Sequence, residues 1–147
     1  METIITDINS KYYKEAISIR TEVFFKDLQN SLELINDQNE SKGYHFVVLK
    51  DKKVIGTGRL NLNSNLAIIS QMAVQPKNQK QGIGSLVLNE MLTFIKTKNI
   101  KQIDLCARLT ALKFYSQKGF KKFGKEFPSK KTGVMHQNMR LEIKNVC

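Results

Sequence analysis

The chain has 147 residues, 41% of them hydrophobic and 25% charged, and a formal net charge of +11. These values predict one globular domain over residues 1–147, without the roughly 20-residue apolar run of a membrane span and without a secretory signal, so we expect no membrane partner. The two cysteines, Cys106 and Cys147, are too few for a disulfide framework and indicate a reduced, cytoplasmic setting. No cysteine or histidine spacing predicts a metal site.

The first half of the chain predicts a strand, a helix and a polar loop before the main run of strands. Residues 2–7 are expected to form the strand, and residues 10–28 the helix, with Ser10 as its N-cap. Residues 30–43 are polar and rich in turn formers, which predicts a loop with one helical turn at most. Binding loops are often of this kind, so this segment could cover a site.

Three strands are expected next, at residues 44–49, 54–61 and 66–74, the first two joined as a hairpin at residues 51–53. The third strand is the most apolar and contains a β-branched pair. This composition favours a central position in the sheet.

The second half predicts a helix over residues 85–98, a strand over 100–107, a helix over 109–118 and two closing strands over 120–127 and 134–143. The core-facing residues of the first of these helices are expected to be Leu88, Met91, Leu92 and Ile95. Strands alternating with helices in this order predict an α/β protein with a mixed sheet.

The run Gln79-Lys80-Gln81-Gly82-Ile83-Gly84 joins the apolar strand to the following helix. Two glycines allow a tight turn and close approach of a ligand, and the helix offers free N–H groups and the positive end of its dipole. This arrangement predicts a cradle for a phosphate or pyrophosphate, although two glycines in a turn are often purely structural. The run lacks the Gly-Lys-[Ser/Thr] of a nucleotide-hydrolysing P-loop.

The positive charge is concentrated on one side of this turn. Residues 1–73 hold 9 Lys+Arg and 9 Asp+Glu, so the whole excess of +11 lies in residues 74–147. A basic field around a phosphate cradle suits a polyanionic ligand, and compositional drift is an equal alternative. The lysines are scattered without a recognisable nucleic-acid motif, so we expect no nucleic-acid partner.

A second motif lies between Cys106 and Phe120, where Ala111, Phe114-Tyr115 and Gly119-Phe120 follow a predicted strand. With the glycine turn, this pattern resembles the GNAT superfamily of acyl-CoA-dependent N-acetyltransferases. The glycine turn is similar to the pyrophosphate-binding motif of that superfamily, and the Phe114-Tyr115 segment is similar to its second signature.

Residues 19–24, 44–48 and 133–140 are also similar to the ElaA/YjcF-type bacterial branch of this superfamily. Two positions depart from the branch. Met135 stands where the branch has proline, and Arg108 stands where it often has glutamine and where many superfamily members have asparagine.

The resemblance implies an α/β GNAT fold with a mixed, mostly antiparallel central sheet of about six to seven strands. The sheet would be splayed at its fourth and fifth strands, with helices on both faces. The resemblance also implies that acetyl-CoA (coenzyme A) binds at the glycine turn and along the fourth strand. The residues that it assigns to this ligand are Met72, Ala73, Val74, Gln79, Lys80, Gln81, Gly82, Ile83, Gly84, Ser85, Arg108, Phe114 and Tyr115.

The implied reaction is direct attack of a primary amine on the thioester in a ternary complex. Tyr115 would protonate the departing thiolate, and the backbone N–H of Met72 would stabilise the developing oxyanion. Glu22 is the first candidate for the base and His136 the second. Gln71 stands where some relatives carry glutamate, and it cannot usefully accept a proton.

The acceptor would contact Arg20, Glu22 and His136, and it could be a small molecule or a protein amine. A homodimer through the closing strands is compatible with the pattern. Two other functions stay open, a non-catalytic acyl-CoA-binding regulator and a basic nucleic-acid or ribosome-associated module.

Each of these residues also has a structural interpretation. Tyr115 can be a core aromatic, and Glu22 can be a surface carboxylate or one paired with Arg20. His136 and His45 can be hydrogen-bonded structural histidines. Cys106 is interpreted as a buried structural thiol in preference to an acylated nucleophile, because no histidine lies near it in the sequence.

Overall fold

The computed structural model describes residues 1–144, and Cys147 lies outside the described residues. The elements in chain order are β1 Glu2–Thr6, α1 Lys11–Phe24, α2 Ser31–Ile35, β2 Tyr44–Lys50, β3 Lys53–Asn63, β4 Leu66–Val74, η1 Pro76–Asn78, α3 Ile83–Lys96, β5 Gln102–Arg108, η2 Leu109–Ala111, α4 Leu112–Gln117, β6 Lys121–Lys122, β7 Phe127–Pro128 and β8 Met135–Glu142.

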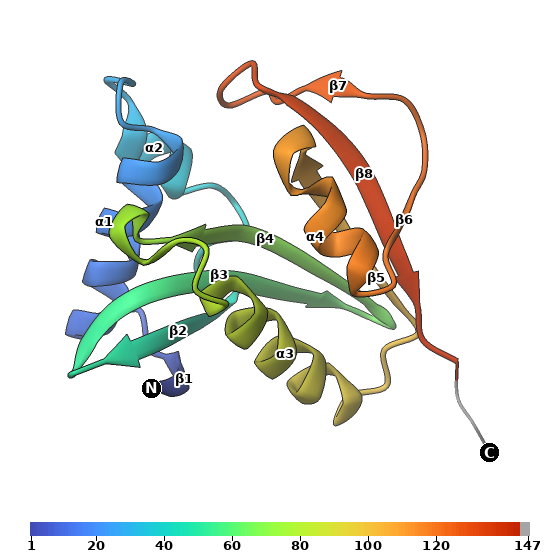
Figure 1. Ribbon diagram of the computed structural model, residues 1–147, viewed down its shortest axis with the longest axis horizontal. Coiled ribbons are helices and arrows are strands. Elements are labelled where there is room, and N and C mark those ends of the chain that lie inside the picture. Colours follow the sequence, from blue (N-terminus) through green and yellow to red (C-terminus); the bar gives the residue numbers. More distant parts are fainter. Residues whose placement is uncertain (145–147) are drawn as a thin grey trace.

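The strands within residues 1–144 form one eight-stranded sheet in the order β1-β2-β3-β4-β5-β8-β6, with β7 also paired to β8. Neighbouring strands are antiparallel except β4 and β5, which are parallel. Figure 1 shows strands β2 to β4 on one side and β5 and β8 on the other, diverging toward one end of the molecule. This arrangement confirms the predicted α/β class, the mostly antiparallel sheet and its splay at β4 and β5.

Two boundaries differ from the sequence prediction at the end of the chain. The segment predicted as one strand over residues 120–127 forms two strands of 2 residues, β6 and β7, so the sheet has eight strands instead of six or seven. Gly124, with a φ of 72°, lies between them and turns the chain away from β8. The helix predicted over 109–118 opens with the 3₁₀ turn η2 and becomes α-helical only at Leu112.

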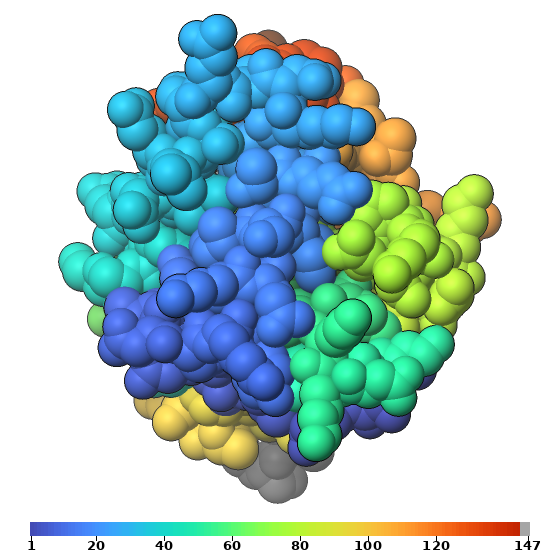
Figure 2. Space-filling model, turned by 90° about the vertical axis from the view of Figure 1, so that its left-hand side faces the viewer, coloured from blue at the N-terminus to red at the C-terminus, as the bar shows by residue number. Residues whose placement is uncertain are grey.

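The two long helices cover opposite faces of the sheet. Val47 and Leu49 of β2 pack under α1, whereas Phe46 and Val48 pack under α3, as the alternation of a strand requires. Figure 2 views the molecule from one side, where α1 and the segment around it, in blue, cover much of the surface. Helices on both faces were predicted, and this layering confirms them.

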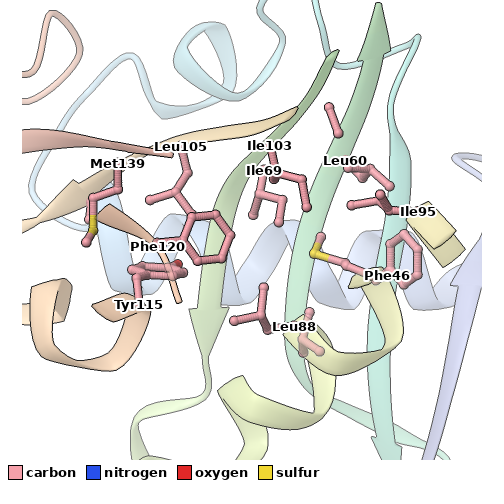
Figure 3. Packing of buried hydrophobic residues seen from close by; sticks show 14 of the residues in the cluster. Phe46, Leu60, Ile69, Leu88, Ile95, Ile103, Leu105, Tyr115, Phe120 and Met139 are labelled. Carbon is pink, nitrogen blue, oxygen red and sulfur yellow. The ribbon is translucent and has the colours of Figure 1, made fainter. Parts of the chain in front are cut away.

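The larger core lies between the sheet and helices α3 and α4 (Figure 3). The predicted apolar stripe of α3 is confirmed, since Leu88, Met91 and Ile95 are fully buried and Leu92 is partly buried. Tyr115 belongs to this core, in which α4 therefore packs beside α3.

Helix α1 begins where the sequence predicts and ends earlier. The Ser10 Oγ accepts hydrogen bonds from the N–H groups of Tyr12 and Tyr13, which is the expected N-cap. The helix ends at Phe24 and not at residue 28, because the chain turns at Phe25, whose side chain is buried. No helix among the described residues is long and apolar enough to cross a membrane.

Candidate active site

Strands β4 and β5 pair along only part of their length. The parallel ladder joins residues 66–69 of β4 to residues 102–105 of β5. Beyond this ladder β4 continues to Val74 and β5 to Arg108, so the facing edges of both strands have no strand partner within residues 1–144. The sheet is therefore open at this point.

A bulge in β4 lies at the opening. The register between β3 and β4 shifts between Thr57 and Arg59, so that Gln71 and Met72 share the place opposite Gly58. Gln71 has a φ of 55°, in the left-handed region. As a result the Met72 side chain packs in the core under α3, whereas the Gln71 side chain reaches toward α1.

The backbone of β4 offers unpaired donors at this opening. The N–H of Gln75 donates to Ile55 O of β3 at 2.8 Å. Since N–H groups of alternate residues in a strand point to the same side, those of Met72 and Val74 point away from β3 and toward the open edge. An amide-bearing ligand could add to this edge as an extra strand does.

The opening forms a cleft of about 350 Å³ between β4, β5, the end of α1, α4 and the segment that joins β7 to β8. Four of the predicted site residues line it, namely Met72, Arg108, Tyr115 and His136. Three aromatic residues, Phe24, Phe25 and Phe127, add apolar surface. The tertiary structure thus brings together residues from four separate segments.

The glycine turn lies at the start of α3. Gly82 is the N-cap with a φ of 82°, and Lys80 also has a positive φ, of 64°. The first bond of the helix runs from the Leu86 N–H to Gly82 O at 3.2 Å, so the N–H groups of residues 83–85 precede the helical ladder. The helix starts at Ile83 and not at Ser85, which places Gly84 in its first turn.

The two sequence motifs meet in space. A Cβ atom on Gly84 would lie 3.6 Å from Cζ of Phe114 on α4. The neighbouring Tyr115 is 7% exposed, and its ring packs against those of Phe114 and Phe120 at 4.9 and 5.8 Å between centroids. Burial raises the pKa of the Tyr115 phenol, which therefore keeps its proton throughout the neutral range.

Arg108 and His136 lie on the other side of the sheet from Tyr115. Ile103, Leu105 and Ala107 of β5 face the α3 core, so the alternate residue Arg108 faces α1. Its guanidinium carbon lies 4.7 Å from the ring centroid of Phe24. His136 of β8 is directly opposite Arg108 in the ladder.

The polar atoms of these two side chains differ in their partners. Nε of Arg108 is buried and has no hydrogen-bond partner among the described residues, and burial lowers the pKa of the guanidinium. Nδ1 of His136 lies 2.8 Å from Val134 O. A carbonyl oxygen only accepts, so Nδ1 carries the proton of the neutral ring and Nε2 is left with a free lone pair.

Five charged residues behind the cleft, Arg20, Asp37, Glu40, Arg59 and Lys131, form what we call the Glu40 cluster. The Glu40 carboxylate is 3% exposed and accepts hydrogen bonds from Arg20 at 2.7 and 2.9 Å and from Arg59 at 2.7 Å. Arg59 and Lys131 both donate to Asp37. The cluster ties α1, β3 and the segment before β8 to the loop that precedes β2.

The Glu40 cluster keeps both of its carboxylates ionised. Burial pushes the pKa of Glu40 upward, but hydrogen bonds from Arg20, Tyr13 and Arg59 and the charge of Arg20 outweigh it and hold that pKa at about 2. The pKa of Asp37 is also about 2, because Lys131 and Arg59 outweigh the effect of its burial. Three cations thus share two carboxylates.

Glu40, Asp37, Arg59 and Lys131 are not marked by any motif in the sequence. One signal was available, since Arg59 lies between the apolar residues of a predicted strand, and a charge in such a place needs a partner. Its partners could not be read from the sequence, because they lie about 20 residues away in a loop. His45, which was considered as a structural histidine, is buried with Nε2 2.9 Å from Glu40 O.

The structure does not bring Arg20 or Glu22 to the cleft surface. Arg20 is 1% exposed and engaged by Glu40, and it reaches the cleft only through a 3.2 Å hydrogen bond from its Nε to Oε1 of Gln71. Glu22 is exposed on α1, and its carboxylate lies 3.5 Å from Nε2 of Gln75 in a different hollow, outside the cleft. The pairing of Glu22 with Arg20 is not formed.

The sequence predicts a buried thiol at Cys106, but this prediction is wrong, because the residue is exposed. The alternation that turns Arg108 toward α1 turns Cys106 the same way, out of the α3 core. Its Sγ donates to Oδ1 of Asn138 at 3.0 Å, and partial burial of the sulfur together with the nearby charge of Asp104 raises the pKa of the thiol. A raised pKa disfavours the thiolate that a nucleophile requires.

Comparison with known proteins shows one family and one fold. Residues 8–143 match the family model described as an acetyltransferase (GNAT) domain. The chain is 25% identical over 132 residues to the uncharacterized N-acetyltransferase YjcF of Bacillus subtilis (strain 168). The aligned region covers 89% of this chain and 93% of that protein.

Two solved structures illustrate the shared fold. Escherichia coli ElaA superposes with a TM-score of 0.80 at 16% identity, covering 96% of this chain and 97% of that one. An aminoglycoside 6′-N-acetyltransferase complexed with coenzyme A superposes with a TM-score of 0.80 at 12% identity, covering 100% and 99%. At these identities the likeness shows the fold.

Proposed function

Since the chain belongs to the GNAT acetyltransferase family and is an N-acetyltransferase, we propose that it transfers the acetyl group of acetyl-CoA to a primary amine by direct attack in a ternary complex. The observation that carries this proposal is that three features lie around one opening in the sheet. These features are the glycine turn, the unpaired edge of β4 and the Tyr115 side chain.

The glycine turn fits the pyrophosphate of coenzyme A. Residues 83–85 offer N–H groups at the positive end of α3, and the cradle residues Gln79, Lys80 and Gln81 are exposed beside them. The left-handed φ of Gly82 turns the chain so that these donors gather at one place. Acetyl-CoA supplies the activated acetyl group when it is bound.

The open edge of β4 fits the amide-rich arm of the same ligand. Met72 and Val74 direct their N–H groups to that edge, with Ala73 between them packed under α1. The Met72 N–H would stabilise negative charge on the reacting carbonyl oxygen. Phe114 and the backbone of Arg108 complete the cofactor-binding set on the opposite wall.

Tyr115 is proposed as the acid. The amine nitrogen forms a bond to the acetyl carbon while the carbon–sulfur bond breaks, so the amine loses one proton and the sulfur gains one. Tyr115 lines the cleft, and its raised pKa keeps the phenol protonated until it donates. The ring is held by two aromatic neighbours, which limits its rotation.

His136 is proposed as the base in place of Glu22. Its Nε2 has a free lone pair, and the side chain lines the cleft, whereas Glu22 lies outside the cleft. The ring is oriented by the 2.8 Å contact of Nδ1 with Val134 O. Such an orienting hydrogen bond is typical of histidines that move protons.

The remaining expectations stay part of the proposal. They are a single domain over residues 1–147, a cytoplasmic location, no nucleic-acid partner and a possible homodimer. The fold supports acetyl-CoA as the donor, since one relative of the same fold is complexed with coenzyme A.

The proposal is tested with the purified full chain. Calorimetry should detect acetyl-CoA binding in the absence of an acceptor, and release of the CoA thiol should then depend on an added primary amine. Stable acetylation of the protein without an amine would favour an acyl-enzyme at Cys106, and Cys106→Ser would remove it. Binding without transfer to any amine would favour a non-catalytic regulator.

A further inference from the structure

The cleft carries an excess of positive charge on the side that faces α1. Its lining includes Arg108, Lys130 and Lys131 but no aspartate or glutamate among the described residues. Lys131 pairs with Asp37 and belongs to the Glu40 cluster, which has three cations for two carboxylates. The wall of the cleft is therefore positive even after its internal ion pairs are counted.

Arg108 is the cation of this wall that has a buried donor atom without a partner among the described residues. Its side chain is half-buried, its guanidinium lies on the Phe24 ring, and its Nε makes no hydrogen bond within residues 1–144. A buried cationic donor without a partner is costly, and a guanidinium presents a planar fork that suits a carboxylate. The missing partner is thus expected to come from a ligand.

The phosphates of the acyl donor are not expected to be the partner of the Arg108 side chain. The glycine turn at residues 79–85 lies outside the cleft lining, and its donors precede α3. Tyr115 belongs to the α3 core, while Arg108 faces α1 from the other side of the sheet. The donor and the Arg108 side chain therefore belong to opposite faces of the opening, and the partner of this side chain would be part of the acceptor.

Arg108 also stands directly opposite His136 in the ladder between β5 and β8. The Cβ atoms of such opposed residues lie about 4.5–5.5 Å apart. A carboxylate on Arg108 would then place an amine on the adjacent carbon within reach of His136 Nε2. Phe24, Phe25 and Phe127 provide apolar surface for the rest of the molecule.

We propose that the acceptor is an α-amino acid with an apolar side chain, whose carboxylate is bound by Arg108 while His136 accepts the proton of its amine. This inference rests on the proposed acetyl transfer and narrows its substrate class. This inference excludes polycationic amines as acceptors, because the positively charged wall of the cleft would repel them.

The test compares matched acceptors at saturating acetyl-CoA, with release of the CoA thiol as the readout. Phenylalanine, phenylalaninamide and phenethylamine share one apolar group and differ in the carboxylate. We expect kcat/KM for phenylalanine to exceed that of the other two by roughly 10- to 100-fold, the range for a hydrogen-bonded charge pair. Spermidine and kanamycin should be poorer still.

Substitutions at Arg108 test whether this residue causes the preference for an acceptor with a carboxylate. Arg108→Gln should raise KM for phenylalanine by a similar factor and so remove most of the preference for phenylalanine over phenethylamine, and Arg108→Lys should recover part of that preference. Lys125→Gln, which removes an exposed cation outside the cleft lining, should keep the preference. Melting temperatures of all variants show whether the fold is retained.

A binding measurement separates this inference from the proposed function. N-acetylphenylalanine and N-acetylphenethylamine are titrated calorimetrically into the CoA-bound chain and its Arg108→Gln variant. Carboxylate-selective binding that Arg108→Gln abolishes would support the anion site even if no amine were acetylated. Transfer to phenethylamine as efficient as to phenylalanine, or equal losses for both acceptors in Arg108→Gln, would overturn the inference and leave the acetyl transfer intact.

Discussion

The carboxylate of Glu40 receives two hydrogen bonds from Arg20, at 2.7 and 2.9 Å, between a helix and a loop that are both buried at this point. Arg59 donates to the same carboxylate from β3. Through Gln71 this pair contacts the bulge of β4 that borders the cleft. The shape of the active site therefore depends on a charge that is not itself part of the chemistry.

Glu40→Gln should lower the stability of the chain strongly. The substitution leaves Arg20 and Arg59 buried without a counter-ion, and breaking a buried ion pair in this way costs about 3–5 kcal/mol. The free energy of unfolding in urea measures the loss. Glu33→Gln on the exposed surface of α2 is the matched control and should change stability by less than about 0.5 kcal/mol. Equal effects of the two variants would contradict a stabilising role for the cluster.

Stability should fall as the pH is lowered, because the cluster must be ionised in the folded chain. The pKa of Glu40 is about 2 in the fold against an ordinary value of 4.5, so its contribution is complete above pH 4.5 and is lost as the pH falls toward 2. This loss is on the order of 3 kcal/mol for the whole interval. Burial also lowers the pKa of His45 below its ordinary 6.5, which adds a loss of the same sign beginning near pH 6.5. Urea midpoints from pH 7 to pH 3 measure the trend, and a flat profile would refute it.

Tyr115→Phe should separate proton donation from packing. Phenylalanine keeps the ring contacts with Phe114 and Phe120 and removes only the hydroxyl of this cleft-lining residue. We expect kcat to fall by roughly 10²-fold or more, the range of general acid catalysis, with little change in the dissociation constant for CoA. Steady-state thiol release and calorimetry measure the two quantities. An unchanged kcat would show that another group protonates the sulfur.

Gly82→Val should weaken binding of coenzyme A through the backbone and not through a clash. A Cβ atom on Gly82 would meet nothing within 4 Å, but the φ of 82° is unfavourable for a β-branched residue. The turn would change its conformation, and the N–H donors of residues 83–85 would no longer point to one place. Gly124→Val is a matched control with a φ of 72° and equally open surroundings, away from the turn. Calorimetric affinities that fall equally in both variants would argue against the cradle.

Lys52→Gly should stabilise the hairpin between β2 and β3. Asp51 and Lys52 form its two-residue turn with φ values of 52° and 64°, a geometry that favours glycine at the second position. We expect a gain of roughly 0.5–1 kcal/mol, seen as a higher melting temperature. Lys53→Gly, one residue further into β3, should lower stability instead, since glycine weakens a strand.

Much of the fold was predictable because its signals are local. The apolar stripe of α3, the cap at Ser10 and the order of strands follow from residues that are neighbours along the chain. The early end of α1 and the division of residues 120–127 into two short strands were not predictable. They depend on how Phe25 is buried and on how the chain leaves β8.

The sequence by itself determined most of the elements, the glycine turn and the segment that contains Tyr115, because periodicity and turn chemistry act over a few residues. Only the tertiary structure decided which residues share the cleft. The bulge at Gln71 sets which side chains of β4 face α1, and the alternation of β5 turns Arg108 away from Tyr115. Glu22 lies on α1 outside the cleft. Arg20 is buried and donates to Glu40, which lies in a loop 20 residues away. Such contacts join distant segments, and pairing between distant charges leaves no periodic pattern in a single sequence.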